Sequence, residues 1–281
     1  MTVRLVHNNY GKSRVQLMKV ARHGEHHELQ NLTVKIAFVG DFTEAHTVGD
    51  NSAVRPTDTM KNTVYALAQE TPDIEEIEDF ALRLADYFLT HNPAATRVIC
   101  EIAEHTWTRL VINGALHPHS FTKGGNEKRT VKVNAARDIV TVTSGVTDLV
   151  ILKTAQSGFA GFPQDRYTTL PETADRIFAT SVTADWLYVN PGAATGDAWH
   201  GVRQTILETF AGHDSLSVQH TLYAMGAAVL EKYPDITEIS LSLPNIHCLP
   251  VDLTRFGLPN ENRIFMPTEE PHGLIEARLA R

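Results

Sequence analysis

The sequence contains 281 residues, of which 42% are hydrophobic and 21% are charged, a balance typical of a folded globular protein. The formal net charge of -8 and the absence of any Lys or Arg run argue against a nucleic-acid-binding role. There is no signal-peptide segment and no long apolar span, the chain does not end in Ser-Lys-Leu, and Cys100 and Cys248 form no disulfide framework. These features predict a cytoplasmic protein.

The first elements in chain order are two strands, residues 14–22 (RVQLMKVAR) and residues 29–40 (LQNLTVKIAFVG), in which apolar residues alternate or run together. The stretch HGEHHE lies between them. The 14 histidines of the sequence raise the question of a metal site, but this stretch is typical of a solvated turn. No His or Cys spacing characteristic of a transition-metal site is found, so no metal and no cofactor are expected.

Two helices follow. The first begins near Thr57, directly after Arg55-Pro56, and the second follows Pro72 and ends at Asn92-Pro93. Thr57 can be understood in two ways, as an N-cap that closes the helix or as a reactive group held at a helix end. The apolar residues at helical spacing are Met60, Val64, Leu67 and Ala68 in the first helix, and Ile74, Ile77, Ala81, Leu84 and Phe88 in the second.

Two further strands are predicted at residues 96–112 and 128–137, joined by a polar loop over residues 113–127. The second half begins with strands at residues 138–145 and 147–156, with Gly145 in the turn between them. A long irregular segment, two helices and two strands (residues 236–244 and 273–280) complete the chain. The helices carry Val202, Ile206, Leu207 and Phe210 in one case and Val218, Leu222, Met225 and Val229 in the other.

The order strand-strand-helix-helix-strand-strand thus occurs twice, which predicts an α+β fold with a duplicated unit, residues 1–137 and residues 138–281. Each unit would form an antiparallel sheet with its two helices on one face. Closing several such sheets into a barrel would remove their exposed edges. An oligomer is therefore expected.

Several motifs occur in an order that closely resembles the urate oxidase (uricase) family, from Tyr10 to about Asp252. They are YGKSRV, DNSAVRPTDTMKNTVY, TWTRL followed by HPHSF, SGFAGFPQDRYTTLPETADRIF, SVQHTLYAM and SLPNIH. The resemblance implies two tandem tunnelling-fold (T-fold) repeats and a homotetrameric barrel around a central tunnel, with active sites at subunit interfaces. It also implies oxidation of urate by dioxygen to 5-hydroxyisourate and hydrogen peroxide without a cofactor.

The resemblance assigns roles to individual residues. Lys12, Thr57 and His247 match the catalytic residues of the family, and Asp58 follows the catalytic Thr. An aromatic residue commonly follows the catalytic His in the family, whereas Cys248 does so here. The residues that match the substrate and oxygen site are Thr57, Asp58, Phe159, Arg176, Val218, Gln219 and Asn245.

The residue types suit these roles. Arg176 offers parallel donors to an oxygen and a ring nitrogen of the planar urate anion, and Gln219 offers the donor and acceptor that complement an amide edge. Phe159 gives the ring a flat surface for stacking. Lys12 would deprotonate the Thr57 hydroxyl or a water on it, and His247 would pass the proton onward. Asn245 would hold dioxygen.

Two alternatives stay open at this point. One is another purine- or pterin-processing T-fold enzyme, such as a cyclohydrolase, which would need a Cys/His zinc site. The other is a non-catalytic purine-binding tunnel protein. The proton-relay set Lys12, Thr57 and His247 argues against mere binding.

Overall fold

The computed structural model describes residues 3–281 as eight strands, five α-helices and two short 3₁₀ helices. The strands hydrogen-bond in the order β1 to β8, so each pairs with its neighbours in sequence and β1 and β8 form the edges. The ladders β1–β2, β2–β3, β3–β4 and β7–β8 are antiparallel. The first of two compact units runs to Gly145 and includes Leu187–Trp199, and the second holds Val146–Trp186 and His200–Arg281.

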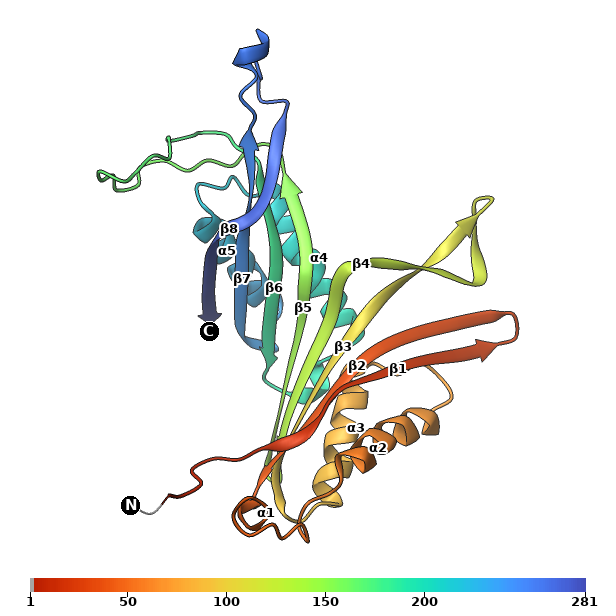
Figure 1. The fold of residues 1–281 in the computed structure, drawn as a ribbon. Helices are drawn as coiled ribbons and strands as arrows, with labels where there is room; N and C mark the ends of the chain where they lie inside the picture. The colour runs from red at the N-terminus through yellow and green to blue at the C-terminus, as the bar shows by residue number, and fades with distance from the viewer. Residues whose placement is uncertain (1–2) are drawn as a thin grey trace. The chain divides into compact units, whose positions relative to one another are not determined.

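In the first unit, alternate residues of β2 between Leu32 and Phe38 are buried, as expected for a sheet covered on one face. The helices α2 and α3 contact each other, and between them they cover β1, β3 and β4 (Figure 1). Burial of Phe88 and Leu84 of α3 contributes about 1.5–3 kcal/mol each. The elements are β1 (Tyr10–His23), β2 (His26–Gly40), α1 (Thr43–Thr47), α2 (Thr57–Glu70), α3 (Ile77–Thr90), β3 (Ala95–Ile112) and β4 (Ala115–Ala136).

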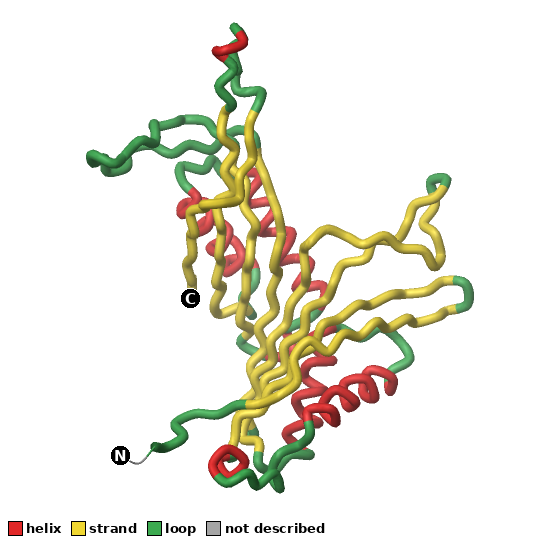
Figure 2. The backbone as a smooth tube through the Cα atoms, viewed as in Figure 1, coloured by secondary structure: helices red, strands yellow, loops and turns green. Residues whose placement is uncertain are grey.

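In the second unit, α5 packs against β7 and β8, and Phe210 of α4 meets Phe178 of β6 with ring centroids 5.2 Å apart. Between β5 and β6 the chain runs through a long segment without helix or ladder, residues 154–177 (Figure 2). The remaining elements are β5 (Ile139–Lys153), β6 (Phe178–Tyr188), η1 (Pro191–Ala193), α4 (Gly196–Gly212), α5 (Val218–Lys232), β7 (Ile236–Pro250), η2 (Thr254–Phe256) and β8 (Phe265–Ala280).

The repeated element order is confirmed, and so are the apolar helix faces except at Leu207 of α4, which is only half-buried. The buried residues of α2 are the four predicted, and those of α5 include all four predicted. The helix α3 begins at Ile77 and not directly after Pro72, so Ile74 precedes it. None of the helices in residues 3–281 is both long enough and apolar enough to cross a membrane.

Three strand predictions are wrong. The polar loop expected at residues 113–127 is mostly strand, because β4 begins at Ala115 and its polar residues pair with β3. No turn occurs at Gly145, which lies inside the continuous strand β5, where its carbonyl accepts a hydrogen bond from the Trp199 indole at 2.8 Å. The strand β6 falls in the stretch expected to be irregular.

Candidate active site

Lys12 lies on β1 at a point where the strand departs from regular pairing. The β1–β2 register shifts between Lys12 and Val15, and Arg14 has a positive φ of 58°. A Cβ on Gly11 would lie 1.9 Å from the Ile36 carbonyl oxygen, so only glycine allows this close approach of β1 to β2. Such bulges redirect side chains and are frequent beside active sites. The bulge in β1 therefore sets the direction of the half-buried Lys12 side chain.

Tyr10 ties the start of β1 to the segment that leads into α2. Its ring meets Phe42 edge-to-face with centroids 4.7 Å apart, and its hydroxyl accepts a hydrogen bond from the Arg55 backbone N–H at 2.9 Å. Burial raises the pKa of the Tyr10 hydroxyl. The Arg55 guanidinium in turn donates to Asn92 Oδ1 and to the His91 carbonyl. Tyr10 and Arg55 each lie two residues from a predicted catalytic position, and neither was predicted to have this role.

Thr57 is the first residue of α2, and Asp58 follows it in the first turn. The N-cap position is occupied by Pro56 and no side chain caps the helix, so the interpretation of Thr57 as the N-cap is wrong. The Asp58 carboxylate accepts from Lys61 Nζ at 2.5 Å and from Asn62 Nδ2 at 3.0 Å.

The pKa of Asp58 is lowered, chiefly by the hydrogen bond and charge of Lys61, with a smaller contribution from the charge of Lys12. The positive charge of Lys12 thus acts at the start of α2, where Thr57 lies. The strand β1, which carries Lys12, contacts the helix α2, which begins with Thr57 and Asp58.

Phe159 and Arg176 lie on the segment between β5 and β6, and backbone bonds hold them together. Phe159 and Thr173 exchange backbone hydrogen bonds of 2.8 and 3.0 Å, and the Arg176 N–H donates to the Ser157 carbonyl at 2.7 Å. The Arg176 guanidinium carbon lies 5.4 Å from the centroid of the Phe159 ring. The ring of Phe162 stacks on Phe159 with centroids 4.8 Å apart and planes 13° apart. Phe162 was missed by sequence reasoning, although it belongs to the quoted GFAGFP stretch.

The Nε atom of Arg176 is buried and has no hydrogen-bond acceptor among residues 3–281. Burial also lowers the pKa of this guanidinium. A buried N–H without a partner costs free energy comparable to a lost hydrogen bond. An acceptor on a flat anion lying against the Phe159 ring would remove this cost.

The start of α5 presents Val218 and Gln219. Ser217 is the N-cap, and its hydroxyl accepts from the His220 N–H at 3.1 Å. Val218 is 4% exposed and packs in the core. Gln219 is exposed, and its side-chain amide makes no hydrogen bond within the described part of the chain.

Asn245 and His247 lie on β7, where the β7–β8 register also shifts. Asn245 Nδ2 and His247 Nδ1 are 3.4 Å apart. If the amide donates, the neutral imidazole carries its proton on Nε2. Within residues 3–281 no hydrogen bond joins this pair to Arg176 or Gln219.

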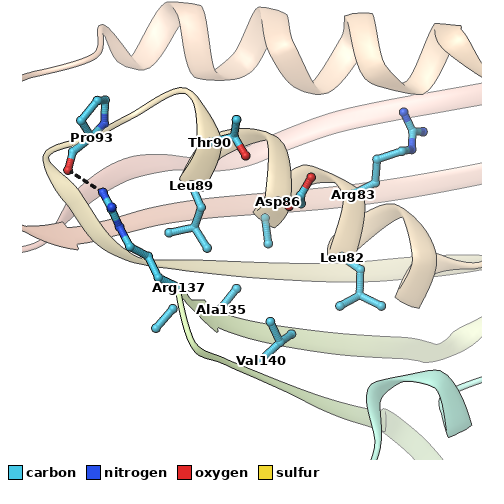
Figure 3. A pocket seen from close by; sticks show the side chains of 11 residues that line it. Leu82, Arg83, Asp86, Leu89, Thr90, Pro93, Ala135, Arg137 and Val140 are labelled. Atoms are coloured by element: carbon cyan, nitrogen blue, oxygen red, sulfur yellow. Dashed lines mark hydrogen bonds between the residues drawn. The ribbon is translucent and has the colours of Figure 1, made fainter.

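The predicted site residues thus lie in one set in the first unit and in three pairs in the second unit, one on the segment between β5 and β6, one at the start of α5 and one on β7. A cavity of about 800 Å³ contains none of them. It is lined by α3 and the turn after β4, with residues such as Leu82, Leu89 and Arg137 (Figure 3). No group of three or more His, Cys, Asp and Glu side chains in the described residues is arranged to hold a metal ion.

Comparisons with known proteins give a consistent result. The family model described as Uricase matches residues 8–134 and 142–276, in agreement with two tandem repeats. The chain is 42% identical over 274 residues to the uricase of Arthrobacter globiformis, covering 98% of this chain and 89% of that protein. It is 38% identical to Uricase-2 isozyme 2 of Glycine max, covering 97% of this chain and 94% of that protein. The crystal structure of the Arthrobacter globiformis uricase superposes with a TM-score of 0.94, covering 100% of this chain and 96% of that chain.

Proposed function

The chain belongs to the uricase family, and we propose that it oxidises urate by dioxygen in purine degradation, at a site formed by the residue groups of its two units. The observation that carries this proposal is Arg176. Its buried Nε lacks an acceptor, and its guanidinium lies over the aromatic ring of Phe159. A planar anion with adjacent oxygen and nitrogen acceptors fits these two features together.

The second unit would bind the substrate. Arg176 would donate two parallel hydrogen bonds to an oxygen and a ring nitrogen of urate, which a lysine cannot do in one plane. Gln219 would pair with the amide edge through its free donor and acceptor, and the Val218 backbone would lie beside it. Phe159 would stack on the ring. These contacts fix the plane and the rotation of the substrate.

The first unit would remove a proton. Lys12 would act as the base for the Thr57 hydroxyl or for a water on it, and Asp58 would help to orient the start of α2. The N–H groups of the first turn of α2 favour an anion at this place. His247 would pass the proton onward, and Asn245 would hold dioxygen over the ring.

The chemistry balances without a resident metal or flavin. Urate loses two electrons, dioxygen gains them, and two protons complete hydrogen peroxide. Water supplies the hydroxyl group of 5-hydroxyisourate. The protein contributes by stabilising the electron-rich urate dianion, which reduces dioxygen, and by holding both reactants in place.

The assembly proposed for this activity is a homotetramer, in which T-fold repeats from several chains close a barrel around a tunnel. In support, β1 and β8 are sheet edges whose backbone groups need partners. Active sites at subunit interfaces would then join the first repeat of one chain to the second repeat of its neighbour. We place the repeat boundary between residues 137 and 138, in the turn where the second copy of the element order begins, and the protein in the cytoplasm.

Family membership does not favour the two alternatives, a cyclohydrolase-like enzyme and a non-catalytic purine-binding protein. The test is the loss of the ultraviolet absorbance of urate together with oxygen consumption, using protein dialysed exhaustively against a chelator. We expect one dioxygen consumed and one hydrogen peroxide formed per urate, with no flavin absorbance. Activity that vanished with the chelator and returned with one metal would overturn the cofactor-free mechanism, and no turnover of urate under any condition would overturn the function.

A further inference from the structure

A buried pair of hydroxyl groups links α5, which carries Val218 and Gln219, to the residues that precede this helix. Thr221 Oγ1 donates to Ser215 Oγ at 2.7 Å, and Ser215 Oγ donates onward to the Ser217 carbonyl at 3.0 Å. Thr221 and Ser215 are both 0% exposed. Neither touches the substrate site as described above, and the proposed mechanism does not use them.

The pair joins the first turn of α5 to the segment that precedes it. A threonine inside a helix commonly donates to the carbonyl four residues earlier. In α5 that carbonyl, of Ser217, accepts the Thr221 backbone N–H at 3.2 Å and the Ser215 hydroxyl, while the Thr221 hydroxyl reaches Ser215 itself. The Ser215 hydroxyl therefore makes two hydrogen bonds to the first turn of α5 and its N-cap, one as donor to the Ser217 carbonyl and one as acceptor from Thr221.

The backbone of Ser215 also bonds to the segment that carries Phe159 and Arg176. Its N–H donates to the Gln156 carbonyl at 3.0 Å, and its carbonyl accepts the Gly158 N–H at 2.7 Å, which makes a parallel bridge with Ser157. A Cβ on Gly158 would lie 3.0 Å from the Thr173 carbonyl oxygen, so the backbones are in close approach here.

The bridge between Ser157 and Ser215 also lies next to Phe159 and Arg176, the two residues of the 154–177 segment that are predicted to bind the substrate. Ser157 accepts the Arg176 N–H at 2.7 Å, and Phe159 pairs with Thr173. Hydrogen bonds thus link Thr221 to Ser215, and Ser215 to Gln156 and Gly158, which flank the Ser157 that accepts from Arg176. Apart from the hydroxyl bonds, all of these are backbone bonds.

We infer that Thr221 is a positioning residue for substrate binding, because its hydroxyl locks Ser215, and with it the spacing between the Phe159–Arg176 pair and the Gln219 turn. This inference rests on the proposed function. It names a residue that acts through the backbone of others, and its effect is on the affinity for the purine and not on the proton relay of the first unit.

The test compares three single variants of the full-length protein. Thr221→Val keeps the shape of the side chain and removes the hydroxyl, and Thr221→Ser restores it. Thr205→Val is the matched control, because Thr205 is also buried (5% exposed) in the second unit and its hydroxyl donates to the Gly201 carbonyl at 2.9 Å, away from the loop. We expect KM for urate to rise about three- to tenfold in Thr221→Val with kcat within about twofold, a normal KM in Thr221→Ser, and a normal KM in Thr205→Val even if its Tm falls.

A second measurement does not depend on turnover. Hydrogen–deuterium exchange of peptides covering residues 156–176 should be faster in Thr221→Val than in Thr205→Val. Wild-type KM together with wild-type exchange in Thr221→Val would overturn the inference and leave the proposed function intact. A wild-type protein that does not oxidise urate would overturn the proposed function, and the exchange comparison would still decide whether Thr221 locks the loop.

Discussion

The two groups of predicted site residues are held by different means. In the first unit, Lys12 and Thr57 belong to a strand and a helix start, and a side-chain bond from Tyr10 to the Arg55 backbone connects them. In the second unit, Phe159 and Arg176 belong to a long segment outside the regular elements, held by a network of backbone bonds around Ser157 and Ser215. Side chains on strands and helices are placed more accurately than those on loops.

This difference matches the proposed division of labour. Proton transfer requires a donor and an acceptor at hydrogen-bond distance, which suits regular elements. Binding a flat anion requires hydrogen-bond donors and an aromatic surface at a fixed spacing. A loop held by backbone hydrogen bonds can provide both. Substitutions at Lys12 and Thr57 of the first unit should therefore reduce turnover, and those at Phe159, Arg176 and Gln219 of the second unit should reduce affinity.

The largest effect is expected for Lys12→Met. Removing the base should lower kcat by about 10²–10⁴-fold and leave binding of xanthine, a purine that lacks the C8 oxygen of urate, nearly unchanged. Steady-state kinetics and calorimetric titration measure the two quantities. Lys35→Met is the control, since Lys35 lies on the adjacent strand β2 in an exposed pair with Glu101. Weaker xanthine binding with normal turnover would move Lys12 from the proton relay to the binding group.

Arg176→Lys should raise KM by about 10- to 150-fold, because the parallel donors are lost and a charged hydrogen bond to the substrate is not replaced. The control is Arg166→Lys, an exposed arginine of the same segment whose guanidinium carbon lies 4.5 Å from the Tyr167 ring centroid. Wild-type affinity for both urate and xanthine in Arg176→Lys would remove Arg176 from the binding group.

Tyr10→Phe should lower kcat by about two- to tenfold with little change in KM, because the Arg55 N–H loses its acceptor and the start of α2 is less firmly placed relative to Lys12. Tyr87→Phe, on α3 of the same unit, serves as the control. A change in KM without a change in kcat would show that the first unit also governs affinity, against the division of labour.

The smallest effect on catalysis is expected at a charged cluster of the first unit. Glu78 is 0% exposed, and with Glu76 it binds Arg129, which also lies 4.0 Å from Glu104. Burial raises the pKa of Glu78, and the opposing effects of the Arg129 charge and the Ser144 hydrogen bond do not cancel this rise, so we expect Glu78 to keep its proton more readily when folded.

A raised folded-state pKa favours folding below the unfolded pKa, and this contribution is lost as the pH rises through the folded value. In Glu78→Gln the free energy of unfolding should therefore fall less steeply as the pH rises from the unfolded to the folded pKa of Glu78. The KM for urate should be unchanged. Denaturant unfolding measured at several pH values tests this, and an unchanged pH profile in the variant would contradict the assignment.

Much of the fold could be predicted because apolar periodicity reports burial directly. Met60, Val64 and Leu67 are buried together on α2 as their spacing indicates. The failures have physical causes. The strand β4 is polar along much of its length and therefore has the composition of a loop. Gly145 suggested a turn, but it lies inside β5, where its carbonyl accepts a hydrogen bond from the buried Trp199.

The site was less predictable from the residues themselves. Its members were assigned by resemblance to a family, since no local spacing relates Lys12 to Arg176. The residues that hold them depend on contacts between distant parts of the chain, as in the bond between Tyr10 and Arg55 or the bridge between Ser157 and Ser215. Such contacts appear only once the strands and the long segment are placed in three dimensions.

We propose that each active site joins the first unit of one chain to the second unit of another. Co-expression of Thr57→Ala and Arg176→Ala tests this proposal, assayed at a urate concentration far below the raised KM of Arg176→Ala, where neither variant alone oxidises urate at a measurable rate. In a mixed pair one interface inherits both lesions and the other inherits neither. With equal amounts and random pairing across a symmetric interface, about a quarter of all sites are intact.

We therefore expect the mixture to recover about a quarter of the wild-type rate of urate oxidation. Thr57→Ala co-expressed with Lys12→Met is the matched control and should recover nothing, since both lesions lie in the same unit. Mixed oligomers of Thr57→Ala and Arg176→Ala, verified by differential tags, that were no more active than either parent would contradict the claim and place the site within one chain.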